Sequence, residues 1–211
     1  MNLITGMSNR KSHLTEELIR HTGELARAGL TPATSSNFSV RLDDATCLIT
    51  ASGRDKGRLT PDDFLEVDMD GNALLPGRTA SAETLLHTQI YRRRPDAGAV
   101  LHTHSLAQTV LSLRHEAAGA LVLQGYELLK ALRGITTHAA VVHVPVVANS
   151  QDMPALCAAI DPAFDKDAFW GYLIAGHGLY TWGRDLPEAR RHLDAFEFLL
   201  SAELAKTGMT P

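Results

Sequence analysis

The spacing of apolar residues along the chain predicts a mixture of helices and strands. Leu14, Leu18 and Leu25 repeat at helical spacing within residues 14–28, and Gly29 follows as a stop signal. The same spacing predicts further helices over residues 81–94, 106–113, 126–132 and 153–160, and a long closing helix that Asp185 caps. Alternating or β-branched runs predict strands over residues 38–42, 47–50, 64–67, 97–104, 140–147, 170–175 and 179–182. Asp70-Gly71 adds a hairpin signal before residues 72–75.

The order of these elements predicts the fold class. The early strands are hairpin-like, the later ones are separated by helices, and no regular βαβ unit repeats. We therefore expect an α/β domain with a mixed central sheet covered by helices. A length of 211 residues suits one ordinary domain, or at most two small ones.

Composition excludes several classes of protein. Hydrophobic residues make up 45% and charged residues 21%, an average globular balance that excludes disordered, collagen-like and coiled-coil chains. The net charge of −4 gives no electrostatic case for nucleic acid. The longest apolar run, over residues 139–148, is far shorter than the ~20 residues that a membrane span needs. With no apolar leader in residues 1–11 and only Cys47 and Cys157 as thiols, we expect a cytoplasmic protein.

Three of the ten histidines have the spacing of a metal site. On a strand, His102 and His104 project from one face and can share a metal, although two half-buried polar residues at a strand edge fit equally well. His177, between two glycines, is the best candidate for a third ligand, and a plain hairpin turn is the alternative. Three protein ligands with an open position are the pattern of a catalytic zinc.

The other histidines point less clearly to chemistry. His87 lies one helical turn after Glu83 and shares its face, so it can orient Glu83 or line the site. Histidines 138 and 143 flank a strand and fit satisfied core positions. Solvent-facing positions on amphipathic helices are expected for His13, His21 and His192.

Two acids and two loops complete the candidate residues. The dipole of its helix already explains Glu83, and an exposed helix position explains Glu127. The loops 34–37 and 51–53 carry hydroxyl groups and free amides that can cradle a phosphate, although most such stretches are ordinary turns. Arg54 and Lys56 either add charge there or are solvated.

Taken together, the motifs resemble the class II aldolase and adducin head family over residues 14–205. The segments HTHS and GHG resemble sequences that are shared by the whole family. The segments GYELLKAL and GHGLYTWG resemble sequences that are specific to its dehydratase branch. The resemblance rests on PATSSNFSVR (32–41), ITASGRDKG (49–57), SAETLLH (81–87), VLHTHS (100–105), QGYELLKAL (124–132) and GHGLYTWG (176–183).

This resemblance implies a fold and a cofactor. The implied fold is a three-layer α/β/α arrangement with a mixed central sheet, formed by a single catalytic domain over residues 1–211. The implied cofactor is one Zn²⁺ per subunit, held by His102, His104 and His177. The family also implies a homotetramer with its sites near subunit interfaces.

Residue roles follow from the same resemblance. Glu127 matches the position that acts as acid and base in the dehydratases, and Glu83 matches the acidic catalytic residue of the sugar-phosphate aldolases. Ser36 stands where the family usually has glycine, which requires a backbone angle that a residue with a Cβ tolerates. The phosphate-binding positions are Thr34, Ser35, Asn37, Ser52 and Gly53.

The resemblance implies a lyase of methionine salvage, part of amino-acid biosynthesis. The expected reaction is zinc-dependent dehydration of 5-methylthioribulose 1-phosphate to 2,3-diketo-5-methylthiopentyl 1-phosphate. An aldolase or epimerase acting on a fuculose- or ribulose-phosphate type of substrate is the alternative. A non-enzymatic domain of the adducin type is disfavoured, because it has no reason to keep all three histidines.

Overall fold

The structure, a computed structural model, describes residues 2–78, 80–81, 83–165 and 170–208. Its α-helices are α1 (Asn2–Arg27), α2 (Thr84–Arg93), α3 (Leu106–His115), α4 (Met153–Ile160) and α5 (Leu186–Lys206). Its strands are β1 (Asn37–Arg41), β2 (Thr46–Thr50), β3 (Phe64–Asp68), β4 (Ala99–Thr103), β5 (Ala120–Gln124), β6 (Val141–Val147), β7 (Gly171–Ile174) and β8 (Gly178–Gly183). Short 3₁₀ helices are η1 (Pro32–Thr34), η2 (Pro61–Asp63), η3 (Glu127–Ala131) and η4 (Asp161–Asp165).

The strands form one mixed sheet in the order β3-β2-β1-β4-β8-β7-β6-β5. Strands β6 and β7 pair in parallel, and every other neighbouring pair is antiparallel. The mixed central sheet expected from the order of elements is therefore confirmed.

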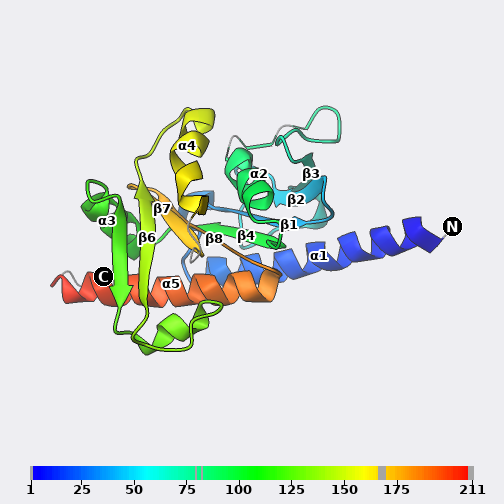
Figure 1. Cartoon of the computed structure of the whole chain (residues 1–211). Coiled ribbons are helices and arrows are strands. Elements are labelled where there is room, and N and C mark those ends of the chain that lie inside the picture. Colours follow the sequence, from blue (N-terminus) through cyan, green and yellow to red (C-terminus); the bar gives the residue numbers. More distant parts are fainter. Residues whose placement is uncertain (1, 79, 82, 166–169, 209–211) are drawn as a thin grey trace.

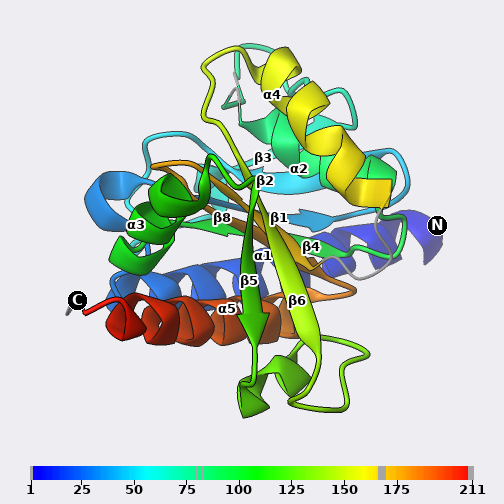
Figure 2. The same cartoon turned by 60° about the vertical axis from the view of Figure 1, so that its left-hand side comes forward.

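Helices cover both faces of this sheet. Helices α1 and α5 run along one face, and α2 and α4 lie on the opposite face (Figures 1 and 2). One apolar cluster, with Leu18, Phe38 and Phe196, fills the space under α1 and α5. A second cluster, with Ile90 and Tyr172, fills the space under α2 and α4. The α/β/α layering is thus confirmed, with a separate core on each side of the sheet.

Strand alternation decides which polar residues face α2. Phe38 of β1 and Leu101 of β4 belong to the core under α1 and α5. Their neighbours Asn37 and His102, which are paired across β1 and β4, therefore point to the other face. Polar side chains needed for chemistry thus gather beneath α2 rather than in the larger core.

Several predicted boundaries differ from the structure. Strand β5 is missing from the predicted elements, because its outward positions Ala120, Val122 and Gln124 give a weak alternation signal. The predicted helix over residues 126–132 is the short 3₁₀ helix η3. The hairpin signal at Asp70-Gly71 leads to a single bridge, between Val67 and Ala73. Helix α1 begins at Asn2 rather than near residue 14. The prediction missed this part because residues 8–13 are all polar and interrupt the apolar spacing.

Four other histidines differ from the predictions in whether they are buried or exposed. His21 and His192 are buried rather than solvent-facing. The Arg133 backbone N–H donates to His192 Nε2 (3.1 Å), so His192 Nδ1 carries the proton and donates to the Trp182 carbonyl (2.7 Å). His138 and His143 are exposed rather than part of the core.

None of the helices in the described ranges combines the length and apolarity needed to cross a bilayer.

Candidate functional site

Three histidines meet at one end of the central strands. His102 and Thr103 are the last two residues of β4, and His104 follows them directly. His177 lies in the turn between β7 and β8. One ligand nitrogen from each lies within 4.8 Å of the other two. The Nε2 atoms of His102 and His104 are 2.8 Å apart. The predicted grouping of these three residues is therefore confirmed, although 75 positions of sequence separate His102 from His177.

The protein fixes the orientation of His102. Its ring is fully buried and stacks on Tyr180, with ring centroids 4.0 Å apart. His102 Nδ1 donates to the Leu179 carbonyl at 3.0 Å, which leaves the Nε2 lone pair facing the other histidines. In metal-binding histidines, a hydrogen bond from the ring nitrogen that does not bind the metal fixes the orientation of the imidazole.

Burial keeps the three imidazoles neutral. It lowers the pKa of His102 well below its usual value, and the neighbouring His104 and His177 lower it further. Burial likewise lowers the pKa of His104 to about 4, and lowers that of His177 against the opposing charge of Glu83. Neutral imidazoles offer lone pairs, so this donor set fits a divalent metal with an affinity for nitrogen.

Gly178 allows the close approach of β8 to β4. A Cβ at this position would lie 2.2 Å from the Thr103 carbonyl oxygen and 3.0 Å from His102 Cε1. A larger residue would therefore push β8 away from the strand that carries His102. This contact explains the second glycine of the GHG motif.

Glu83 faces the histidines from the start of α2. It occupies the N-cap position of this helix, which begins at Thr84, three residues later than the predicted start at residue 81. Its Oε1 lies 3.4 Å from His177 Nε2, and its Oε2 lies 4.0 Å from His102 Nε2. Tyr180 donates a hydrogen bond to Oε2 at 3.3 Å. The carboxylate is therefore placed to act on a metal or on a ligand held by the histidines.

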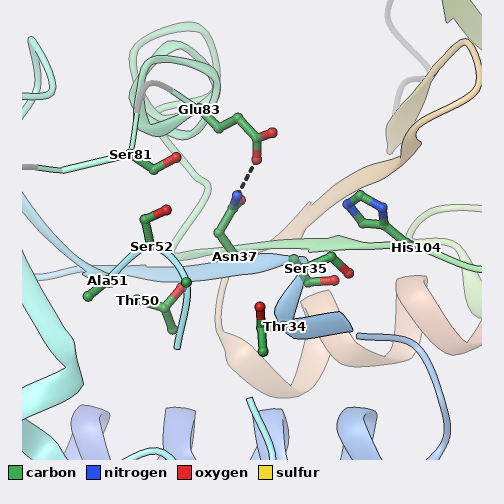
Figure 3. Close-up of a pocket in the computed structure, with 11 residues that line it drawn as sticks. Thr34, Ser35, Asn37, Thr50, Ala51, Ser52, Ser81, Glu83 and His104 are labelled. Carbon is green, nitrogen blue, oxygen red and sulfur yellow. Dashed lines mark hydrogen bonds between the residues drawn. The ribbon is translucent and has the colours of Figure 1, made fainter. Parts of the chain in front are cut away.

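A polar pocket adjoins the histidines. Figure 3 shows Asn37 reaching Glu83 in the middle of this pocket, with Ser52 and Ser81 on one side and His104 on the other. All five residues predicted to bind phosphate line it, namely Thr34, Ser35, Asn37, Ser52 and Gly53. The pocket thus joins the two loops to the histidine cluster. Sequence reasoning missed Thr50 and Ser81, which also line it.

The first loop of the pocket has an unusual backbone. Ala33, Thr34 and Ser36 have φ angles of 51°, 63° and 76°, in the left-handed region that favours glycine. The Ser36 hydroxyl donates to the Leu30 carbonyl at 3.2 Å, which ties this residue to the end of the first helix. Ser36 therefore adopts the left-handed conformation despite its Cβ, at a cost of roughly 1–2 kcal/mol.

Lys56 is buried beneath this loop. Only 2% of its surface is exposed, so it is not solvated. Its Nζ donates to the carbonyls of Thr34 (2.9 Å) and Arg54 (2.8 Å). Burial lowers the pKa of Lys56, and the charges of Asp55 and Glu83 oppose that effect. The ammonium therefore joins the two pocket loops and adds positive charge behind them.

Glu127 lies far from the histidines of its own chain. Val147, at one end of β6, pairs with Ile174, which comes three residues before His177. At the other end, Val141 pairs with Gln124, which comes three residues before Glu127. Strand β6 separates these ends by roughly 20 Å. Glu127 begins η3 in the connection between β5 and β6, so the fold does not bring it to the other candidate site residues. Figure 2 shows this connection at the end of the two strands, away from α2 and α4.

A half-buried carboxylate supports the segment after His104. Glu197 of α5 accepts hydrogen bonds from Ser105 (2.9 Å) and from the Gln108 side chain (2.8 Å). Ser105 in turn caps α3 by accepting from the Gln108 backbone. Burial raises the pKa of Glu197 above its usual value of 4.5, although the two hydrogen bonds oppose the shift.

The raised pKa of Glu197 gives a pH-dependent stability. The folded chain binds this proton more tightly than the unfolded chain, so the stability from this group is present at low pH and is lost as the pH rises through the raised pKa. Glu197→Gln removes the charge and keeps an acceptor oxygen. The free energy of unfolding of the variant, relative to the unmodified protein, should therefore increase between about pH 4 and pH 8. Urea titrations across this range measure the difference, and a constant or decreasing difference would contradict the assignment.

Comparison with known proteins identifies the family. Residues 16–204 match the family of the Class II Aldolase and Adducin N-terminal domain. The chain belongs to this family. The predicted resemblance is therefore confirmed, and the histidine cluster lies in a family whose members generally use a divalent metal.

Two named relatives and one solved structure show which class II aldolase family members this chain is similar to. The chain is 57% identical over 195 residues to a methylthioribulose-1-phosphate dehydratase of Xanthomonas campestris, with 92% of this chain and 90% of that protein covered. A protein of the same name from Stenotrophomonas maltophilia is 56% identical, with 92% of each chain covered. Among solved structures, L-fuculose-1-phosphate aldolase of Thermus thermophilus matches with a TM-score of 0.74 and 28% identity, over 93% of this chain and 96% of that chain.

Proposed function

We propose that the protein dehydrates 5-methylthioribulose 1-phosphate to 2,3-diketo-5-methylthiopentyl 1-phosphate, a step of methionine salvage. The observation that carries this proposal is the 57% identity to relatives named as methylthioribulose-1-phosphate dehydratases over 92% of the chain. The activity is that of a hydro-lyase, and residues 1–211 act as one catalytic domain. Two unpaired thiols, Cys47 and Cys157, agree with a cytoplasmic location.

Zinc is the cofactor we propose, one ion per subunit. His102, His104 and His177 hold it, since their neutral nitrogens converge on one point. When bound, the zinc supplies Lewis-acid stabilisation for the negative charge that develops on the substrate oxygens. His177 Nδ1 is buried with no hydrogen-bond partner among the described atoms, which agrees with a site completed by a ligand.

The phosphate of the substrate binds in the pocket between the two loops. The Ser35 hydroxyl is buried there and has no partner within the described ranges, so it is available to a bound anion. Thr34, Ser52 and Gly53 offer further hydroxyl and amide groups around the same space. Asn37 lines this pocket too, although its side-chain amide contacts Glu83.

Loss of the Lys56 charge should weaken phosphate binding. Lys56→Met removes the buried ammonium that joins the two loops, so the KM should rise about 10-fold while kcat changes less. Steady-state kinetics measure both constants. Arg58→Met is the matched control, because this nearby cation is exposed. An equal rise in KM for the two variants would contradict the role of Lys56.

A role for the remote Glu127 in the proposed reaction would need a second copy of the chain. In its own subunit, Glu127 is exposed and pairs with Lys130, whose ammonium lowers its pKa. Val122 and Val141 expose apolar side chains on one face of the β5–β6 hairpin. We infer that this hairpin packs on a neighbouring subunit of a homotetramer and delivers Glu127 to the neighbour's histidines.

Glu127 then acts as acid and base in the reaction. It takes the proton from C3 of the substrate, and the electron pair of that bond moves toward the C2 carbonyl. The protonated carboxyl next donates to the C4 hydroxyl, which leaves as water while the C2 carbonyl re-forms and a C3–C4 double bond is made. The enol that remains takes up a proton at C4 and loses the proton of its C3 hydroxyl to become the 2,3-diketone, so one water is lost and the electron count is unchanged.

A direct assay tests the proposed reaction. The zinc-loaded protein is given methylthioribulose 1-phosphate, and diketone formation is followed. Turnover to the diketone is the expected result. Absence of turnover, combined with cleavage of fuculose 1-phosphate or ribulose phosphates, would overturn the proposal.

One observation favours a second candidate, an aldolase or epimerase on a related sugar phosphate. Glu83 matches the acidic residue of the aldolases and faces His177 directly. A carboxylate there can move a proton during cleavage or inversion of a carbon centre. Product analysis with the same set of sugar phosphates distinguishes the two candidates.

A further inference from the structure

A buried chain of hydrogen bonds leads from the core to Glu83. The Ser39 hydroxyl lies 2.8 Å from the Tyr91 hydroxyl and 2.7 Å from His87 Nδ1. His87 Nε2 contacts Asn37 Oδ1, and Asn37 Nδ2 donates to Glu83 Oε2. We call these five residues the Glu83 chain.

The Glu83 chain is closed to solvent along most of its length. Ser39 and His87 are 0% exposed, Tyr91 is 1% exposed and Asn37 is 7% exposed. Water therefore cannot replace a lost partner at its inner links. Buried hydrogen bonds of this kind strengthen one another, and an unpaired member carries the full cost of desolvation.

The chemistry of the end member fixes the direction of every bond. A carboxylate only accepts, so Asn37 turns its NH₂ to Glu83 and its carbonyl oxygen to His87. His87 Nε2 must then carry a proton, because it faces that oxygen. The reverse orientation would set the Asn37 oxygen against the carboxylate, two acceptors in contact.

The same reasoning continues inward from His87. Burial lowers the pKa of His87 to about 3, so the ring is neutral and Nδ1 keeps its lone pair. The Ser39 hydroxyl donates to this nitrogen, and the Tyr91 hydroxyl donates to Ser39. Each donor therefore points toward Glu83.

We propose that His87 is a positioning residue that fixes the Asn37 amide and thereby directs the Glu83 carboxylate at the three histidines. The inference deepens the proposed function, because it concerns how the metal site is supported. Glu83 lies at the N-cap of α2 without a side-chain capping bond, so its own helix does not hold it. Apart from the three histidines, the hydrogen-bond donors described for the Glu83 carboxylate are Asn37 and Tyr180.

Zinc affinity, measured by chelator competition without substrate, tests the role of His87. His87→Leu should lower this affinity about 10-fold, as loss of a group that orients a metal site does. It should also lower kcat while the KM for the substrate is unchanged. His87→Gln should restore most of the zinc affinity and most of kcat, since its amide N–H can reach the Asn37 oxygen. If the glutamine variant restores neither the zinc affinity nor kcat, the inference is contradicted.

The same helix supplies a matched control. Gln89 is 5% exposed and donates to the Cys157 carbonyl (2.8 Å) and to Asp161 (3.2 Å), on the side of α2 that faces α4. Gln89→Leu removes a buried polar group of α2 without touching the Glu83 chain, so zinc affinity should be unchanged. Equal losses in His87→Leu and Gln89→Leu would show that His87 only stabilises the helix.

Milder variants and a mutant cycle complete the test. Ser39→Ala and Tyr91→Phe keep the fold and should lower zinc affinity less than His87→Leu, in order of distance from Glu83. In a Glu83→Ala background, His87→Leu should cause no further loss of zinc affinity. An equal loss with and without Glu83 would overturn the inference. These measurements need no turnover, so they stand apart from the outcome of the dehydratase assay.

Discussion

Glu127→Gln should lower kcat by about 10²–10⁴-fold, the range that general acid–base catalysis contributes. Glutamine keeps the size of the side chain but cannot take the C3 proton. The residue is exposed, and strand β6, roughly 20 Å long, separates its end of the hairpin from the end near His177, so the variant should keep its fold and its zinc. Kinetics on the zinc-loaded variant, with zinc content measured in parallel, check this result.

Mixed oligomers separate a shared site from a site within one chain. Glu127→Gln subunits keep their histidines, and His102→Ala subunits keep Glu127. Random mixing of the two inactive variants should restore about one quarter of the wild-type activity, because one site in four pairs intact histidines with an intact Glu127. No recovery from oligomers shown to contain both variants would contradict the proposed exchange.

His102→Ala should abolish zinc binding and lower kcat on the order of 10³-fold or more, since the bound metal supplies several kcal/mol of charge stabilisation. His102 is the fully buried member of the cluster, with its orientation fixed by Leu179 and Tyr180. Metal analysis and kinetics measure the two losses. His13→Ala, which removes an exposed histidine of α1, should change neither. Full retention of zinc in His102→Ala would contradict the proposed ligand set.

The histidine cluster was predictable because strand alternation is strictly local. His102 and His104 share a face in any extended strand, and the glycines beside His177 already indicated a close backbone approach. The structure adds that Gly178 is needed for contact with β4. The fold class was predictable for a similar reason, since the order and spacing of the elements show a mixed sheet.

Burial and distance were not predictable in the same way. Lys56, His21 and His192 are polar residues that the core encloses, and only tertiary packing decides this. Nor does the sequence place Glu127 relative to the histidines, because this depends on the length of the β5–β6 hairpin. Strand β5 itself has too weak an alternation to be predicted.

The Glu83 chain is a third feature that could be predicted only in part from the sequence. A helical spacing predicts that His87 can orient Glu83, and in the structure both side chains contact Asn37. The sequence does not show, however, that Asn37 of β1 joins His87 to Glu83, or that Ser39 of β1 joins Tyr91 to His87. Two separate segments, β1 and α2 with its N-cap, build this chain, and only the packing of α2 against β1 brings them together.

The reach of the β5–β6 hairpin has a consequence for how the enzyme becomes active in a cell. Under the proposed exchange of Glu127 between subunits, a newly made chain stays inert until it meets another copy, since each copy lends its acid–base group and borrows that of a neighbour. The amount of working enzyme therefore follows assembly rather than synthesis. A single defective copy also silences a site on an otherwise intact neighbour.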